Sequence, residues 1–422
     1  MRTFCHLVLV ASSLAVPGLT EGQSSTTRHG FSVDRLARID SVLERAVTRG
    51  EIAGAVALVM RDGQPVYERA VGWSDRESSR RMRVDDIFRI ASQTKALTSV
   101  GIMALAEEGK LSLRDPVSRY IPAFERTTVI MRSDTGRAIV PARRRITIRD
   151  LLTHTAGISY GTDSLLAPLY AARGLGPAAG WGWYTADKDE PVCTTMERLA
   201  TLPFFSQPGE RFVYGYSTDV LGCVIERVSG QPLDAFMRAR ITEPLGMRDT
   251  HFFLPAEKRG RLATVYASGG DGLAARAPAG PRGQGDYVDG PRRSFSGGAG
   301  LVSTAHDYAR FLQMLLNGGA LDGVRILAPS TVALMTSNQT GTLYSQDGEG
   351  FGLGFSTVER PGAGGRVESV GTFNWGGAYG SKYAVDPRQR LILLFMIQQI
   401  PDRTDVAMNF PMLVYQALVE PR

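Results

Sequence analysis

Strand-like apolar runs lie near both ends of this chain, and helical patterns fill its middle. Residues 53–60 and 66–71 are two apolar runs joined by a turn at 61–65, which predicts a β-hairpin. Further strand-like runs follow near the C-terminus, at residues 350–358, 369–373, 380–385 and 390–397. The two ends are therefore expected to share one antiparallel sheet. The predicted fold class is α+β: an antiparallel β-sheet built from both chain ends and flanked by helices, with a mainly helical part inserted.

Apolar residues recur at helical spacing in residues 33–50, and a long apolar helix follows residues 88–91 and ends at Gly109. Other helices are predicted at residues 146–152, 221–228, 305–316 and about 408–419. Two segments without clear periodicity are predicted as an irregular excursion and a surface loop, 162–192 and 268–293. We expect one cooperative domain over residues 33–422. Its α/β part covers about 33–100 and 297–422, and its helical part about 101–296.

The N-terminus has the pattern of a secretory signal peptide. Arg2 precedes an apolar run at residues 7–16, which is too short for a permanent membrane anchor. We expect residues 1–24 to be cleaved and the mature protein to be periplasmic or secreted, with no stable membrane anchor. An apolar N-terminus on a cytosolic protein is the alternative.

Composition excludes several classes of protein. The chain has 422 residues, 43% of them hydrophobic and 21% charged, as in an ordinary globular protein. Its net charge of +6 is carried mostly by arginine. The arginine clusters at 80–83 and 143–145 are interpreted as solvated surface, because no interleaved aromatic residues or known nucleic-acid motif accompany them. We therefore expect no nucleic-acid partner, and the oligomeric state is not predicted.

The cysteines give a weaker signal. Cys193 and Cys223 remain after the leader, and they could pair in an oxidising compartment. Cys223 also fits a small core residue, because it lies in an apolar helical run. No motif with metal-ligand spacing is present. The sequence predicts no metal and no other cofactor.

The segment Ser92-Gln93-Thr94-Lys95 is the one S-x-x-K of the chain. Residues at i and i+3 share a helix face, so Lys95 is expected to lie against Ser92. A serine hydroxyl needs a neighbouring base, and a lysine can serve because burial favours its neutral amine. The helix N-terminus also places the Ser92 N–H where an oxyanion could form. Taken alone, the pattern equally fits a capping serine and a solvent-reaching lysine.

The sequence around this motif resembles a known family. The resemblance rests on ordered segments at residues 88–122, 151–157, 208–212, 297–304, 311–319 and 323–327. Together they resemble the serine β-lactamase and penicillin-binding superfamily, and most closely the class C β-lactamase-like family VIII carboxylesterases. The resemblance covers about residues 33–418. It implies a β-lactamase/transpeptidase-like fold and a covalent acyl-enzyme on Ser92.

The family's Tyr-x-Asn motif matches Tyr214-Gly215-Tyr216. The resemblance gives Tyr214 the role of a second acid/base, because a phenol beside a cationic amine can relay a proton to the leaving group. Tyr216 stands where the asparagine is expected, and it is predicted to contact the substrate. This departure makes recognition of a β-lactam side-chain amide doubtful.

The family's Lys-Thr-Gly motif matches Trp375-Gly376-Gly377. These three residues are predicted to bind substrate, since the glycines let the backbone approach it closely. The resemblance places the N–H of Ala378 with that of Ser92 in the oxyanion hole. Loss of the lysine removes a positive charge for a β-lactam carboxylate, and Trp375 offers an apolar wall. The exchange indicates neutral esters.

A second serine motif competes for attention. Residues 157–161 form a G-x-S-x-G pattern around Ser159, but that elbow requires a preceding strand and a following helix. A predicted helix precedes it and a loop follows, so Ser159 is not favoured as the nucleophile. His154 is interpreted as structural. His251 and His306 are expected at the surface and are given no role.

The sequence therefore predicts a serine hydrolase that cleaves short-chain carboxylic esters, with a small-molecule ester as its partner. The main alternative is a β-lactamase, D-Ala-D-Ala carboxypeptidase or D-amino-acid peptidase acting on cell-wall-like substrates. A third hypothesis is a catalytically silent binding protein on the same scaffold. The retained Ser92, Lys95 and Tyr214 argue against that third reading.

Overall fold

The structure is a computed structural model that describes residues 27–133, 136–176, 185 and 187–422. The predicted signal peptide, residues 1–24, lies outside the described residues. Within the described part of the chain, no helix is long and apolar enough to cross a membrane.

One eight-stranded antiparallel sheet dominates the molecule, in the order β15-β16-β17-β18-β19-β3-β4-β5. The N-terminal strands are β3 (Gly54–Arg61), β4 (Gln64–Asp75) and β5 (Arg80–Arg81). The C-terminal strands are β15 (Glu349–Phe351), β16 (Ser356–Val358), β17 (Phe373–Gly376), β18 (Gly380–Asp386) and β19 (Leu391–Gln398). β19 pairs with β3 from Leu391↔Arg61 to Ile397↔Ala55, which joins the two ends of the chain. This confirms the predicted α+β fold.

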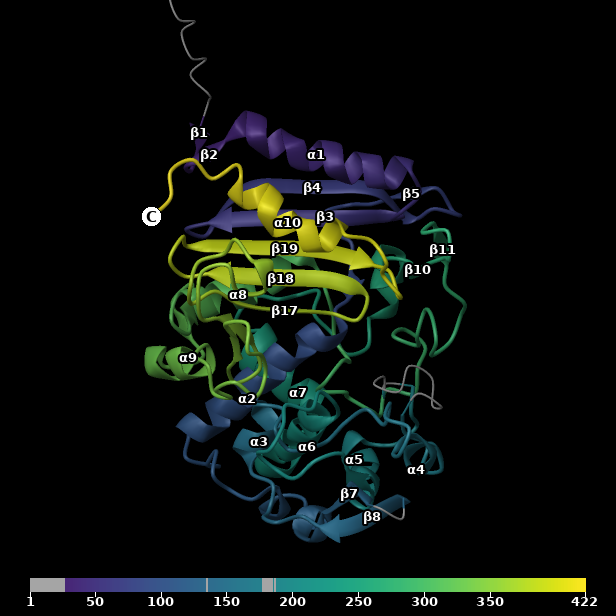
Figure 1. Cartoon of the computed structure of the whole chain (residues 1–422). Coiled ribbons are helices and arrows are strands. Elements are labelled where there is room, and N and C mark those ends of the chain that lie inside the picture. The colour runs from purple at the N-terminus through teal and green to yellow at the C-terminus, as the bar shows by residue number, and fades with distance from the viewer. Residues whose placement is uncertain (1–26, 134–135, 177–184, 186) are drawn as a thin grey trace, which may run out of the picture.

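Helices cover both faces of the sheet (Figure 1). On one face α1 (Val33–Thr48) and α10 (Val406–Tyr415) form an apolar cluster with one set of β3 and β19 side chains. On the other face lie α2 (Thr94–Glu107) and α8 (Ala305–Leu316), within the larger core. Alternate residues of a strand point to opposite faces of the sheet. Because both faces are covered here, every residue of β19 is buried.

A mainly helical part lies below the sheet in Figure 1. Its helices are α3 (Ile148–Leu152), α4 (Ala167–Ala171), α5 (Val192–Ala200), α6 (Ser217–Ser229) and α7 (Leu233–Met237). A small sheet accompanies them, formed by β7 (Thr128–Ser133), β8 (Gly136–Pro141) and β9 (Pro203–Phe204). The boundary predicted at residue 100 falls inside α2, which packs against α6 and therefore belongs to both parts.

The remaining elements are short. They are β1 (Thr27–Arg28), β2 (Phe31–Ser32), β6 (Phe88–Arg89), β10 (Tyr266–Ser268), β11 (Ala274–Arg276), β12 (Val302–Ser303), β13 (Ala320–Leu321), β14 (Val324–Arg325) and α9 (Pro329–Met335). The pair of β6 with β12 matters most for the site, since β6 leads directly to Ser92.

Several sequence-based expectations need correction. The run predicted as one strand at 350–358 is a hairpin of β15 and β16, with Gly354 in the left-handed region between them. The strand predicted at 369–373 is a turn, and β17 begins only at Phe373. The segment 268–293 contains β11 and a buried Tyr287, so it is not merely a surface loop. Its apolar residues are too few to show the periodicity of a helix or strand, but some of them, such as Tyr287, pack into the core.

Cys193 of α5 and Cys223 of α6 form a disulfide. The sequence allowed two alternatives, this pairing or a role for Cys223 as a small core residue. Both side chains are buried as well, so the bridge lies within the helical part.

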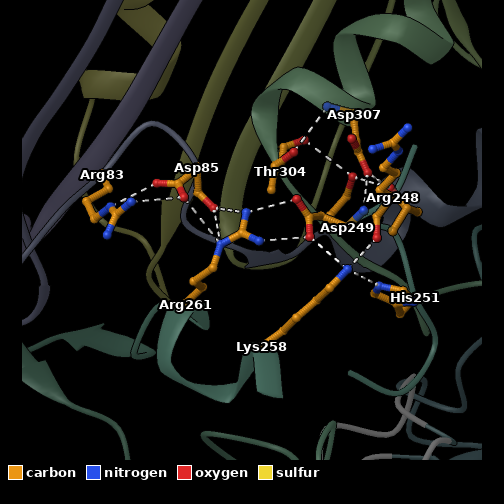
Figure 2. Close-up of polar contacts among 11 residues, drawn as sticks. Arg83, Asp85, Arg248, Asp249, His251, Lys258, Arg261, Thr304 and Asp307 are labelled. Carbon is orange, nitrogen blue, oxygen red and sulfur yellow. Dashed lines mark hydrogen bonds and ion pairs between the residues drawn. The ribbon is translucent and has the colours of Figure 1, made fainter. Parts of the chain in front are cut away.

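Charged side chains connect the segment 248–261 to Asp85, which lies just before β6 (Figure 2). Arg261 and Lys258 each donate to Asp249 at 2.9 Å, and the Lys258 Nζ lies 3.2 Å from Nε2 of His251. His251 is partly buried rather than superficial. Burial, aided by Lys258, lowers the pKa of His251 to about 4. These contacts hold Asp85, which lies just before β6, the strand that leads to Ser92.

Candidate active site

Ser92 lies in a single 3-10 helical turn, Ala91–Gln93, between β6 and α2. The preceding residue, Ala91, has a φ of 41°, in the left-handed region that is costly for a residue with a Cβ. Pairing of β6 with β12 holds this conformation, as does the bond from the Arg89 backbone N–H to the Gln398 side chain at 3.0 Å. The turn carries Ser92 to the wall of a cavity. Strain of this kind is typical of functional positions.

Lys95 is 2% exposed, and its Nζ has three hydrogen-bond partners. The Nζ lies 2.7 Å from the Gly298 carbonyl oxygen, 3.1 Å from the Tyr160 hydroxyl and 3.2 Å from Ser92 Oγ. The i, i+3 spacing therefore places the amine at the nucleophile. The other two contacts come from segments 203 and 65 residues away along the chain.

A buried carboxylate supports this arrangement. Asp219 is fully buried and accepts hydrogen bonds from Ser296 Oγ at 2.6 Å and from the Gly298 N–H at 3.2 Å. Burial raises the pKa of Asp219, while those bonds and the Lys95 charge oppose the rise. Gly298 thus links the carboxylate to the lysine. Sequence reasoning missed Asp219, although an acidic residue within the apolar run of α6 was a usable signal.

Two tyrosines flank the lysine. The Tyr214 ring centroid lies 4.7 Å from Lys95 Nζ, and its hydroxyl accepts a bond from Trp375 Nε1 at 3.2 Å. Tyr160 bonds to the lysine through its own hydroxyl, and burial raises the pKa of Tyr160 well above its ordinary value. Sequence analysis assigned the acid/base role to Tyr214 and gave Tyr160 none. Tyr160 contacts the amine through its hydroxyl, and Tyr214 contacts it through the face of its ring.

The segment Gly376–Ala378 lies directly against the nucleophile turn. A Cβ on Gly377 would lie 2.5 Å from the Ile90 carbonyl oxygen, so only glycine permits this approach. Within the described residues, neither the Ser92 N–H nor the Ala378 N–H forms a hydrogen bond. Both residues line the same cavity. Their joint role as an oxyanion hole stays a prediction.

The competing serine motif has a different role. Ser159 Oγ accepts a bond from the Gly161 N–H at 3.0 Å, and the side chain is buried away from the cavity that Ser92 lines. The pattern therefore shapes the loop that delivers Tyr160.

His154 is buried, and its ring lies 4.8 Å from that of Tyr214. Burial, followed by the Lys95 charge, lowers the pKa of His154 well below its ordinary value. A neutral, packed ring fits the predicted structural role. It supports Tyr214 from behind.

Comparison with known proteins places this geometry in a family. The β-lactamase family model matches residues 39–414. The chain belongs to the β-lactamase family. This confirms the resemblance to the serine β-lactamase and penicillin-binding superfamily, and the protein is an enzyme of the serine hydrolase type.

Its relatives include esterases. Protein Rv1367c of Mycobacterium tuberculosis is 37% identical over 84% of this chain and 87% of its own. Esterase EstB of Burkholderia gladioli is 34% identical over 87% of this chain and 92% of its own. Among solved structures, EstCE1, described as a hydrolase with promiscuous acyltransferase activity, is 28% identical with a TM-score of 0.75. It covers 92% of this chain and 99% of its own.

The β-lactamase-family site opens into a cavity of about 520 Å³. Ser92, Tyr160, Tyr214, Trp375, Gly376 and Ala378 line one end of it. Tyr216, predicted to contact substrate, does not: it is fully buried, and its hydroxyl accepts a bond from the Gly176 N–H at 3.1 Å. Its ring packs on Tyr160 at 4.9 Å. The asparagine position has become part of the core, which is a correction to the prediction.

No group of three or more His, Cys, Asp or Glu side chains in the described ranges is arranged to hold a metal ion. The groups that this chain offers for chemistry are a hydroxyl, an amine, two phenols and two backbone N–H groups. They are the parts that acyl transfer needs.

Proposed function

We propose that this protein is an exported esterase that hydrolyses short-chain carboxylic esters through an acyl-enzyme on Ser92. The observation that carries the proposal is the contact of Lys95 with Ser92 beside a cavity that Trp375 also lines. Lactamases of the family have a lysine where Trp375 stands, so this wall favours an uncharged acyl or alcohol group. The relatives named as esterases support the same reading.

The reaction follows from the contacts. Lys95 acts as the base and takes the proton of Ser92 as Oγ attacks the ester carbonyl carbon, and the carbonyl oxygen accepts hydrogen bonds from the N–H groups of Ser92 and Ala378. Tyr214 gives its proton to the departing alkoxide as the C–O bond breaks, and it regains a proton from Lys95, so that both groups return to their starting state. Water then attacks the acyl-enzyme through the same groups, which releases the acid and restores Ser92.

Export is the second part of the proposal. It is supported by the apolar run at residues 7–16 behind Arg2. The disulfide between Cys193 and Cys223 is consistent with an oxidising compartment. The periplasm or the exterior of the cell is the location expected.

The decisive experiment compares Ser92→Ala with Ser78→Ala, a variant at an exposed serine. With p-nitrophenyl butyrate, Ser92→Ala is expected to lower kcat by at least about 10⁴-fold, and Ser78→Ala should leave it unchanged. A fluorophosphonate probe should label the wild type at Ser92. Full activity in Ser92→Ala would overturn the mechanism. Far faster turnover of nitrocefin than of the ester would overturn the esterase assignment and favour a β-lactamase.

A further inference from the structure

The cavity at Ser92 continues around the end of β17 to the other face of the sheet. Trp375 and Tyr383 are opposite one another on β17 and β18 and face the core that contains α2. The neighbouring pair, Gly376 and Lys382, therefore faces the opposite side, towards α10. Lys382 and α10 residues such as Met408 line the same cavity as Ser92.

Lys382 has an unusual environment for a lysine. Its side chain is partly buried, yet among the described residues its ammonium group forms no hydrogen bond or ion pair. Burial lowers the pKa of Lys382, Arg366 lowers it further, and Asp402 opposes them. An amine in such a place is stabilised by any acceptor that enters the cavity.

The charged neighbours do not supply that acceptor. Arg366 is paired with two carboxylates, Glu349 and Glu368, and also donates to Asn374, with each bond at 2.9 Å. Glu368 is buried against this guanidinium. Among the described residues, Lys382 is thus the one cation lining the cavity that forms no ion pair. Asp402 acts on it only through the longer-range effect of its charge.

Lys382 is also close to the catalytic end. A Cβ on Gly376 would lie 3.6 Å from Lys382 Cγ and 4.0 Å from its Nζ, so the lysine folds over this glycine. Gly376 and Ala378 are two residues apart, which limits their separation to about 7 Å. A small molecule can therefore reach the oxyanion N–H groups and the Lys382 ammonium together.

We propose that Lys382 binds a carboxylate at the far end of the acyl chain, which makes monoesters of aliphatic dicarboxylic acids the preferred substrates. The proposal rests on the esterase function above and narrows its substrate class. The ester carbonyl lies at Ser92, the methylene chain crosses Gly376 between Trp375 and the apolar side chains of α10, and the carboxylate pairs with the ammonium group. Lys382 lies on β18, whereas the lysine of Lys-Thr-Gly corresponds to Trp375 on β17.

The test compares two ethyl esters of equal chain length, monoethyl adipate and ethyl hexanoate, by titrating the acid released. The wild type should prefer monoethyl adipate in kcat/KM. Lys382→Met should lower kcat/KM for monoethyl adipate by about tenfold or more, with ethyl hexanoate changed less than about twofold. Lys110→Met, at an exposed lysine paired with Glu108, is the matched control and should change neither. Lys382→Arg should keep much of the preference.

Two results would overturn the inference: equal activity of the wild type on both esters, or an equal loss on both esters in Lys382→Met. If Lys382→Met does not fold, inhibition of the wild type decides instead. Free adipate should then inhibit p-nitrophenyl butyrate hydrolysis more strongly than hexanoate, and equal inhibition contradicts the proposal. Absence of any Ser92-dependent ester hydrolysis would instead refute the proposed function itself.

Discussion

Two lysines near the two ends of the cavity are in opposite circumstances: Lys95 lies behind Ser92, and Lys382 lines the cavity beyond Gly376. Lys95 is almost fully buried and has three acceptors within the protein. Lys382 is only partly buried and has none within the part of the chain that the structure describes. A fully coordinated amine is held in place for one reaction, whereas an uncoordinated one is available to a ligand. The difference separates the chemical step at Ser92 from substrate selection beyond Gly376.

The largest expected effect is the contrast between Lys95→Met and Lys382→Met. Removing Lys95 takes away the base, so kcat should fall at least about 10³-fold on every ester, charged or neutral. Lys382→Met should spare neutral esters. Initial rates on p-nitrophenyl butyrate measure both, with circular dichroism to verify folding. If Lys95→Met retained a tenth or more of the activity, Lys95 would not be the base.

A smaller effect distinguishes the two phenols at the catalytic end. Tyr214→Phe should lower kcat by about 10²-fold, because it removes the predicted proton relay. Tyr160→Phe should cost about tenfold, because it removes one acceptor of the Lys95 ammonium and leaves the relay in place. The kcat values of the two variants decide the assignment. A larger loss in Tyr160→Phe would transfer the relay to Tyr160.

The smallest expected effects concern two adjacent glycines. Gly377 lies against the turn that holds Ser92, and Gly376 lies beside Lys382. In Gly377→Ala the new methyl would meet the Ile90 carbonyl at 2.5 Å, displace the nucleophile turn and lower kcat by about 10²-fold. In Gly376→Ala the nearest atom is the Ser381 carbonyl oxygen at 3.1 Å, and Lys382 lies just beyond. Because the acyl chains of both esters cross Gly376, that variant should lower kcat/KM on both, with the larger loss on monoethyl adipate, for which Lys382 is displaced as well. Identical profiles for the two variants would show that the ends are not separable.

Local patterns in the sequence predicted much of the fold. The hairpin of β3 and β4 and the helix α8 were visible from their periodicity, and α8 begins and ends at the residues expected. Errors occurred where periodicity is interrupted. The hairpin of β15 and β16 looked like one strand, because Gly352 and Gly354 reverse the chain within a single apolar run.

The site divides in the same way. Ser92 and Lys95 could be paired from the sequence, because the geometry of one helical turn depends only on neighbouring residues. Family resemblance added Tyr214 and the segment from Trp375 to Ala378, whose roles remain predictions. Asp219, Tyr160 and Lys382 were missed as functional residues, since each acts through contacts with segments far away in the chain.

The sequence by itself therefore predicted the nucleophile and its base, and the strands at both ends that meet in one sheet. Only the tertiary structure decided what surrounds them: which phenol bonds to Lys95, that Tyr216 lies in the core, and that Lys382 shares a cavity with Ser92. The reason is physical. Backbone periodicity records interactions across a few residues, while a cavity wall depends on how strands and helices from distant segments pack.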